Sequence, residues 1–219
     1  MSAQGFRDHD NALELLRQFV RRPRNVEQCE LCGLELGEAH QHLFEPSTRK
    51  VLCSCDACVV LLSGRANARF KRVPRNVRFL EDFHLTDARW DSLMIPINMA
   101  FIFKSSPEER MMAMYPSPAG ATESLLPLET WSEIVQHNPA LDTMEPDVEA
   151  LLVNRIGHSR GFSAPEYYLL PIDECFKLVG VIRLYWKGFS GGAELWKEVA
   201  HFFTELKRKA VAPAEGAHA

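Results

Sequence analysis

Two Cys-x-x-Cys pairs constrain this chain more than any other feature: Cys29-Glu-Leu-Cys32 and Cys55-Asp-Ala-Cys58, with 22 residues between them. Pairs at this separation are typical of a tetrahedral site in which four thiolates hold one metal ion. Gly33 directly follows the first pair, which favours a knuckle, a tight turn whose backbone N–H groups donate to the sulfurs. The sequence therefore predicts a metal site made of Cys29, Cys32, Cys55 and Cys58.

The second pair indicates a helix instead of a second knuckle. An apolar run, residues 59–62, follows the last cysteine and ends at Ser63-Gly64, which is typical of a short helix that ends at a glycine. A knuckle, a hairpin and a helix that supplies the last two ligands make up a treble-clef or zinc-ribbon-like module. A rubredoxin-type iron site needs a glycine after the second pair as well, so we expect Zn2+, with iron as the alternative.

A further thiol and two histidines leave the ligand set open. Cys53 precedes Cys55 by two residues, and alternate residues of a strand point to the same face, so Cys53 is an alternative ligand to Cys55. His40 and His42 are candidates for an additional ligand, or for groups that hydrogen-bond to the ligands. The competing interpretation is that Cys53 is a small core residue and that both histidines are surface groups.

Composition and charge restrict the class of protein. The 219 residues are 46% hydrophobic with a net charge of −4, which predicts a globular protein with a sizeable core and excludes a globally basic nucleic-acid binder. Six cations and no acid lie between Arg65 and Arg78, which indicates a local cationic patch. The chain shows no membrane span and no secretory signal, so we expect a cytoplasmic protein, where clustered cysteines favour metal over disulfides.

The expected fold class is α+β, a small cysteine module beside a mixed α/β domain with a short sheet and several helices. We expect an N-terminal helix in residues 1–25, a cysteine-rich zinc-binding module in 26–80, an α+β domain in 81–210 and a disordered tail in 211–219. Periodicity in the α+β domain predicts helices at 86–93, 128–137, 146–155, 173–185 and from 192, strands at 97–104, 111–115 and 167–172, and a rigid loop at 115–124. Residues 178–182 fit a central strand equally well, because periodicity does not settle short apolar runs.

The chain lacks the common catalytic motifs, namely Gly-x-Ser-x-Gly, His-Glu-x-x-His and the dinucleotide fingerprint. Zinc sites made only of cysteines are closed and structural. We therefore expect that the protein is not an enzyme. The cysteine pairs and His42 also resemble the zinc-braced core of HNH nucleases, where such a histidine activates water beside a catalytic metal. Val59 stands where those enzymes place a second histidine, so nucleic acid is not the expected partner.

Six segments taken together resemble an uncharacterised bacterial protein family with an N-terminal four-cysteine module, often encoded in NiFe-hydrogenase gene clusters. The segments are 29–33, 40–43, 52–58, 115–124, 149–155 and 186–196. The resemblance implies an accessory protein for hydrogenase assembly, maturation or function, with a hydrogenase subunit or maturation factor as partner. We therefore expect a non-catalytic zinc-binding adaptor. The alternatives are a rubredoxin-like iron electron-transfer protein and an HNH-like nucleic-acid-binding protein or nuclease.

Overall fold

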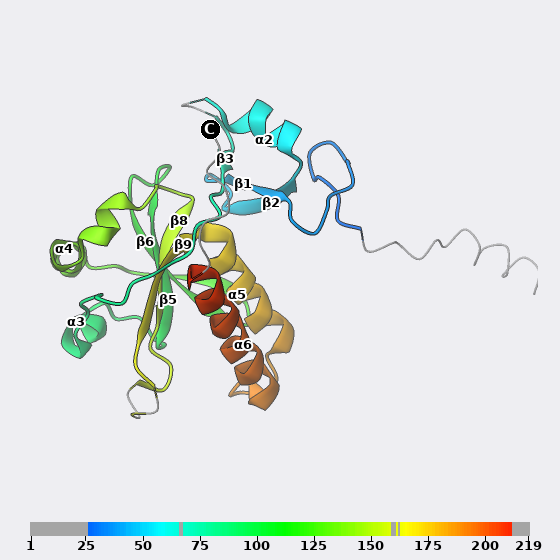
Figure 1. Ribbon diagram of the computed structural model, residues 1–219. Coiled ribbons are helices and arrows are strands. Elements are labelled where there is room, and N and C mark those ends of the chain that lie inside the picture. The colour runs from blue at the N-terminus through cyan, green and yellow to red at the C-terminus, as the bar shows by residue number, and fades with distance from the viewer. Residues whose placement is uncertain (1–25, 66–67, 159–160, 162, 212–219) are drawn as a thin grey trace, which may run out of the picture.

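The computed structural model describes residues 26–65, 68–158, 161 and 163–211 (Figure 1). The helix predicted within residues 1–25, and the tail from residue 212, lie outside the described residues. Within them, five α-helices and one 3-10 helix accompany two antiparallel sheets. The fold is therefore mixed α and β, as predicted. No helix in this part of the chain is long and apolar enough to cross a membrane.

The smaller sheet, at the top of Figure 1, has the strand order β2-β1-β3 and carries the cysteine module. Its elements are β1 (Gln41–Glu45), β2 (Lys50–Ser54), α2 (Asp56–Ser63) and β3 (Lys71–Arg72). Leu43 and Leu52 face α2 and form a small core with Val59 and Phe70. Because alternate residues point to opposite faces, Phe44 lies on the other face and joins the core of the larger sheet.

The larger sheet has six strands in the order β4-β9-β8-β5-β6-β7. The strands are β4 (Arg78–Phe79), β5 (Met99–Ser105), β6 (Arg110–Ser117), β7 (Gly120–Ser124), β8 (Glu149–Asn154) and β9 (Glu166–Pro171). The accompanying helices are α3 (Asp87–Ser92), α4 (Leu128–His137), the 3-10 helix η1 (Pro139–Thr143), α5 (Ile172–Tyr185) and α6 (Gly192–Val211). Although β4 lies at the end of the range predicted for the cysteine module, it pairs with β9.

Helices cover both faces of the larger sheet and make three layers (Figure 1). Phe101 and Phe103 point to the face covered by α5 and α6. Ala100 and Ile102, which alternate with them, point to the face covered by α3, α4 and η1. The central strands are therefore buried on both sides.

The helix predicted at 146–155 is wrong, because this segment contains β8. The strand lies between β5 and β9. Ala150 and Leu152 point toward α5 and α6, whereas Leu151 and Val153 point toward the opposite layer. A strand covered on both faces is a continuous apolar run, and periodicity does not separate such a run from a buried helix.

The rigid loop predicted at 115–124 is also wrong, because this segment completes β6 and forms β7. The two strands pair from Ala113 with Ser124 to Ser117 with Gly120. Pro116 is tolerated because the pairing of β6 with β5 ends at Met114, so no ladder bond to β5 requires its missing N–H. With β7 and β8 added, the sheet is larger than the predicted short one.

The small sheet meets the larger domain through an apolar contact with α5 and through an ion pair. The rings of Phe44 and Phe176 lie 6.1 Å apart between centroids. Lys71 Nζ lies 2.6 Å from Asp147 Oδ2, and Asp147 is buried. Arg69 pairs with Glu45 within the cysteine module itself. Two cations of the run between Arg65 and Arg78 thus neutralise acids of the chain itself.

Candidate metal centre

The structure brings together the four cysteines predicted as ligands. The sulfurs of Cys29, Cys32, Cys55 and Cys58 all lie within 4.8 Å of one another. Cys32 Sγ and Cys55 Sγ are 3.7 Å apart. Four sulfurs at tetrahedral Zn–S bond lengths would be about 3.8 Å from one another. The four thiols are therefore placed to hold one metal ion.

The first pair lies in a small hairpin that the sequence specifies locally. The Gly33 N–H donates to the Cys29 carbonyl at 2.8 Å, and the Cys29 N–H donates to the Leu34 carbonyl at 2.8 Å. Gly33 has a φ of +75°, a conformation that costs glycine little. Glu30 joins this turn to β2, because its carboxylate accepts the Cys53 N–H at 3.0 Å.

The second pair lies at the N-terminus of α2. Cys55 is the residue before the first helical turn, Cys58 lies within that turn, and the helix ends at Gly64 as predicted. The Val59 N–H donates to the Cys55 carbonyl at 3.1 Å, and the Val59 side chain is buried beneath the helix. The positive end of the helix dipole favours thiolates at this position.

The sulfurs differ in how readily they ionise. Burial opposes ionisation of Cys29, but backbone N–H groups of Cys55, Leu31 and Cys32 donate to its sulfur and lower its pKa to about 6. Burial, together with contacts to the other three sulfurs, raises the pKa of Cys58 to about 12. Cys29 therefore ionises more readily than Cys58. A cation placed among the sulfurs would favour ionisation of all four.

Cys53 belongs to a separate cluster with the two histidines. His40, His42 and Cys53 each offer a ligand atom, and these atoms lie within 4.8 Å of one another. His42 and Cys53 are direct cross-strand partners in β1 and β2. The geometry thus groups Cys55 with the other three cysteines and Cys53 with the histidines. Burial, then the charges of nearby Glu27 and Glu30, raise the pKa of the Cys53 thiol.

Asp173 also belongs to this region, although sequence reasoning predicted it only as a helix cap. It is the second residue of α5, and Pro171 occupies the cap position. Its Oδ2 lies 2.6 Å from His42 Nδ1, across 131 residues of sequence. No local pattern could have paired two residues so far apart in the chain.

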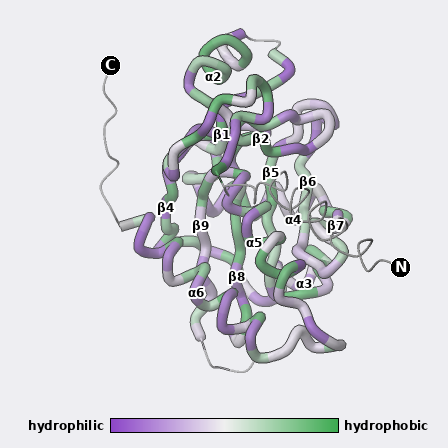
Figure 2. The backbone as a smooth tube through the Cα atoms, turned by 90° about the vertical axis from the view of Figure 1, so that its right-hand side faces the viewer, coloured by the Kyte–Doolittle hydropathy of each residue, from purple (hydrophilic) through white to green (hydrophobic). Residues whose placement is uncertain are grey.

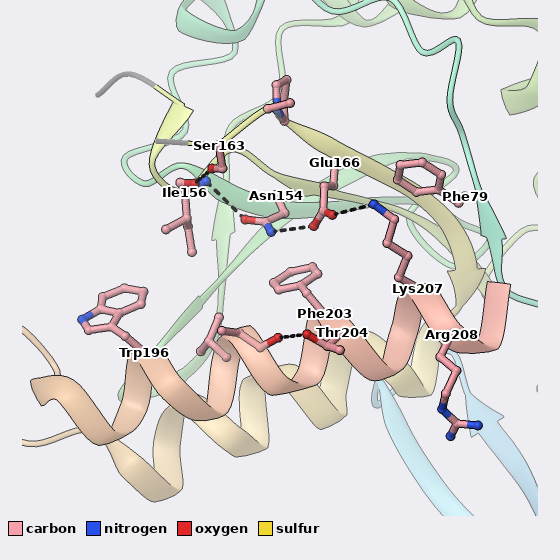
Figure 3. Close-up of a pocket in the computed structure, with 14 residues that line it drawn as sticks. Phe79, Asn154, Ile156, Ser163, Glu166, Trp196, Phe203, Thr204, Lys207 and Arg208 are labelled. Carbon is pink, nitrogen blue, oxygen red and sulfur yellow. Dashed lines mark hydrogen bonds and ion pairs between the residues drawn. The ribbon is translucent and has the colours of Figure 1, made fainter. Parts of the chain in front are cut away.

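A separate groove of about 1160 Å³ runs between α6 and the ends of β8 and β9 (Figure 3). Trp196 and Phe203 of α6 contribute apolar surface to it. Asn154 donates to Glu166 at 3.2 Å, and Lys207 Nζ lies 3.6 Å from the same carboxylate. Glu166 and Lys207 therefore pair with each other, as Figure 3 shows, whereas Arg208 pairs with Glu205.

Comparison with protein-family models identifies a match over residues 28–210 with DUF5947, described as a family of unknown function. No curated protein and no solved structure matches the chain. The match confirms the prediction of an uncharacterised protein family. It begins beside the first cysteine pair, contains both sheets and reaches the last turn of α6. The chain therefore belongs to the DUF5947 family.

Proposed function

We propose that this protein is a non-catalytic zinc-binding adaptor, in which a closed four-thiolate site holds a partner-binding helix in place. One observation carries the proposal. The helix that supplies Cys58, α2, exposes Val60 and Leu61 to solvent at 76% and 75%. Figure 2 shows α2 as a strongly hydrophobic segment at the outer end of the molecule.

The thiolate set supports a structural zinc ion. Four cysteines fill a tetrahedral coordination sphere and leave no position for substrate or water. A knuckle, the β1–β2 hairpin and α2 follow one another in the chain, which is the element order of a treble-clef module. The second pair lies at a helix N-terminus, whereas a rubredoxin-like iron site would have a second knuckle there. Zinc is therefore the proposed ion and iron the alternative.

The exposed apolar side chains support a protein partner. Contiguous apolar surface on a soluble protein marks interaction sites, and burying one Val or Leu side chain contributes about 1.5–3 kcal/mol. Because α2 has only eight residues, its position depends on the metal site and on the small core beneath it. The resemblance to a family encoded beside NiFe hydrogenases makes a hydrogenase subunit or maturation factor the partner we propose, in the cytoplasm.

The metal part of the proposal is tested by elemental analysis and visible spectroscopy on full-length protein purified without added metal. We expect a colourless protein with a zinc ion that resists dialysis and is absent from Cys32→Ser. Cys175→Ala is the matched control, because Cys175 is a thiol of the main core, and it should keep its zinc. Iron with thiolate absorbance would instead favour electron transfer. Unchanged zinc in Cys32→Ser would contradict the four-thiolate site.

The adaptor part is tested by charge substitution on α2. Leu61→Glu should keep its zinc and its fold but lose co-purification with NiFe-hydrogenase subunits from cells that produce both. Leu184→Glu is the control, because Leu184 of α5 is equally exposed at 75% but belongs to a different surface. Equal recovery of hydrogenase subunits with the two variants would refute the docking role of α2.

A further inference from the structure

We propose that His40, His42 and Cys53 form a second transition-metal site, open at one coordination position, at the junction of the two sheets. The proposal is independent of the adaptor function, since it uses none of the four clustered cysteines. It rests on the geometry of the β1–β2 hairpin and on the hydrogen bonds of both imidazole rings.

The hairpin places the three side chains on one face. His42 pairs directly with Cys53 across the two strands. His40 precedes His42 by two residues, and alternate residues of an extended segment share a face. The imidazole rings of His40 and His42 lie edge to face, with centroids 4.9 Å apart. Ligand atoms of all three residues fall within 4.8 Å of one another, a separation that one metal ion can bridge.

His40 presents an unpartnered nitrogen. Its Nδ1 lies 3.0 Å from the Gly37 carbonyl, which accepts only, so Nδ1 carries the proton and Nε2 keeps a lone pair. Nε2 is buried and has no hydrogen-bond partner within the described structure. Leaving a buried acceptor unsatisfied costs about 1–3 kcal/mol. A metal ion bound at Nε2 would remove this cost.

Asp173 fixes His42 in the same tautomer as His40, with the proton on Nδ1. The Asp173 carboxylate accepts from His42 Nδ1 at 2.6 Å, so Nε2 is the nitrogen left to bind a metal. A carboxylate behind a ligating histidine fixes its tautomer and raises its basicity, and ligating histidines almost always donate their other ring N–H to a carboxylate, a carbonyl or water. Glu27 adds a carboxylate 3.4 Å from His40 Nδ1, whereas Glu30, which accepts the Cys53 N–H at 3.0 Å, is already paired with Lys50.

The donor set selects the class of ion. Two imidazoles and one thiolate suit Zn2+, Co2+, Ni2+ and copper, whereas Mg2+ and Ca2+ require oxygen ligands. Three protein ligands leave a fourth position for water or for a donor from another molecule. His42 is only partly buried, so solvent reaches the site. We therefore infer an exchangeable ion here, bound more weakly than the ion of the closed four-thiolate site.

The test is a Co2+ titration of full-length protein whose four-thiolate site already holds zinc, followed by visible absorption and equilibrium dialysis. Wild type should bind one further equivalent of Co2+, with a thiolate-to-cobalt charge-transfer band. His42→Ala and Cys53→Ala should lose this equivalent and keep their zinc. Asp173→Asn retains all three ligands and should weaken Co2+ binding by about 10- to 100-fold. His201→Ala, which removes an exposed histidine of α6, should bind Co2+ like wild type.

Two results would overturn the second site. One is wild type that takes up no Co2+ beyond its zinc equivalent, and the other is His42→Ala that takes up as much as wild type. These results are distinguishable from failure of the proposed function. Absence of zinc from the four cysteines contradicts the zinc adaptor, whereas absence of the additional equivalent contradicts only the site of His40, His42 and Cys53.

Discussion

Arg155 shows how one buried charge joins separate parts of the larger domain. Its side chain is 3% exposed, and its guanidinium contacts Asp87 of α3 and donates to the Tyr167 hydroxyl at 3.2 Å. It also lies 5.6 Å from the centroid of the Trp90 ring. A buried cation requires such partners, because losing one leaves an uncompensated charge. Arg155, which directly follows β8, therefore holds α3 against this end of the strand through its contact with Asp87.

This contact makes a prediction about pH. Hydrogen bonds from Arg155, and then from His158, lower the pKa of Asp87 below its ordinary value of 3.8. Because the folded-state pKa is the lower one, the stability that Asp87 contributes is complete above pH 3.8 and is lost as the pH falls through the folded-state pKa. Asp87→Asn should therefore be less stable than wild type at pH 7, and the difference should shrink toward pH 3.

Urea unfolding of both proteins at pH 7, 5 and 3 measures that difference. Asp87 lies outside the cysteine module, so the loss of a metal ion bound there at low pH would affect both proteins equally and cancel in the comparison. A difference in unfolding free energy that stays constant from pH 7 to pH 3 would show that the charge of Asp87 contributes nothing to stability.

At the residue scale, spacing alone predicted the four clustered cysteines, because each pair belongs to one local turn. It left Cys53 and Cys55 as alternatives, and the geometry places them in different clusters. Cys53 and His42 were predicted as possible additional metal groups. Asp173 was not linked to either, because its contact with His42 depends on how α5 packs against the small sheet. Sequence patterns report neighbours along the chain and rarely report such tertiary contacts.

At the scale of single elements, two glycines differ in whether the backbone needs a glycine at their position. Gly180 lies within α5, and a Cβ there would meet no atom within 4 Å. Gly191 precedes α6 with a φ of +85°, and a Cβ there would lie 2.5 Å from Leu195 Cδ2. The first glycine only weakens its helix, whereas the second is required by the turn.

Alanine substitutions should therefore change stability in opposite directions. Gly180→Ala should stabilise the protein by about 0.5–1 kcal/mol, because alanine is the better helix former. Gly191→Ala should destabilise it by at least about 1–2 kcal/mol, because the left-handed conformation is costly for alanine and Leu195 must also move. Urea unfolding of the two variants measures both changes. If both substitutions changed the free energy of unfolding in the same direction, the two positions would not differ in the backbone conformation that they require.

Elements with a clear local signal were predicted correctly. Thr86 caps α3 by accepting the Arg89 N–H, and the amphipathic stripes of α4 and α6 match their apolar spacing. The errors fell on β7 and β8. Pro116 in β6 and Pro118 in the turn before β7 are typical of a loop, and β8 is buried on both faces, so its apolar residues do not alternate with polar ones. In both cases the surroundings of the strand decided the structure.

At the scale of the whole molecule, Phe44 is an apolar link between the small sheet and the larger domain. It is buried, and it belongs to the core that α5 and α6 share. Phe44→Ala should cost about 3–5 kcal/mol, because it leaves a cavity between two packed layers. Phe189→Ala is the control, since Phe189 is fully exposed, and it should change stability by less than about 0.5 kcal/mol.

Urea unfolding measures both variants, and hydrogen exchange locates the effect. In Phe44→Ala, the amides of β1 and β2 should exchange faster than those of β8. If amide exchange became faster by the same factor in both sheets, the small sheet would not open independently of the larger domain.

The contact between His42 and Asp173 has a consequence for the order in which the protein matures on the ribosome. Every residue of the four-thiolate cluster has been synthesised once Cys58 is added, so a nascent chain already holds a complete ligand set. His42 gains its carboxylate only 131 residues after its own synthesis, when α5 begins. A metal ion that binds the four cysteines would thus find all its ligands during translation, whereas the contact of His42 with Asp173 forms only after residue 173 has been added.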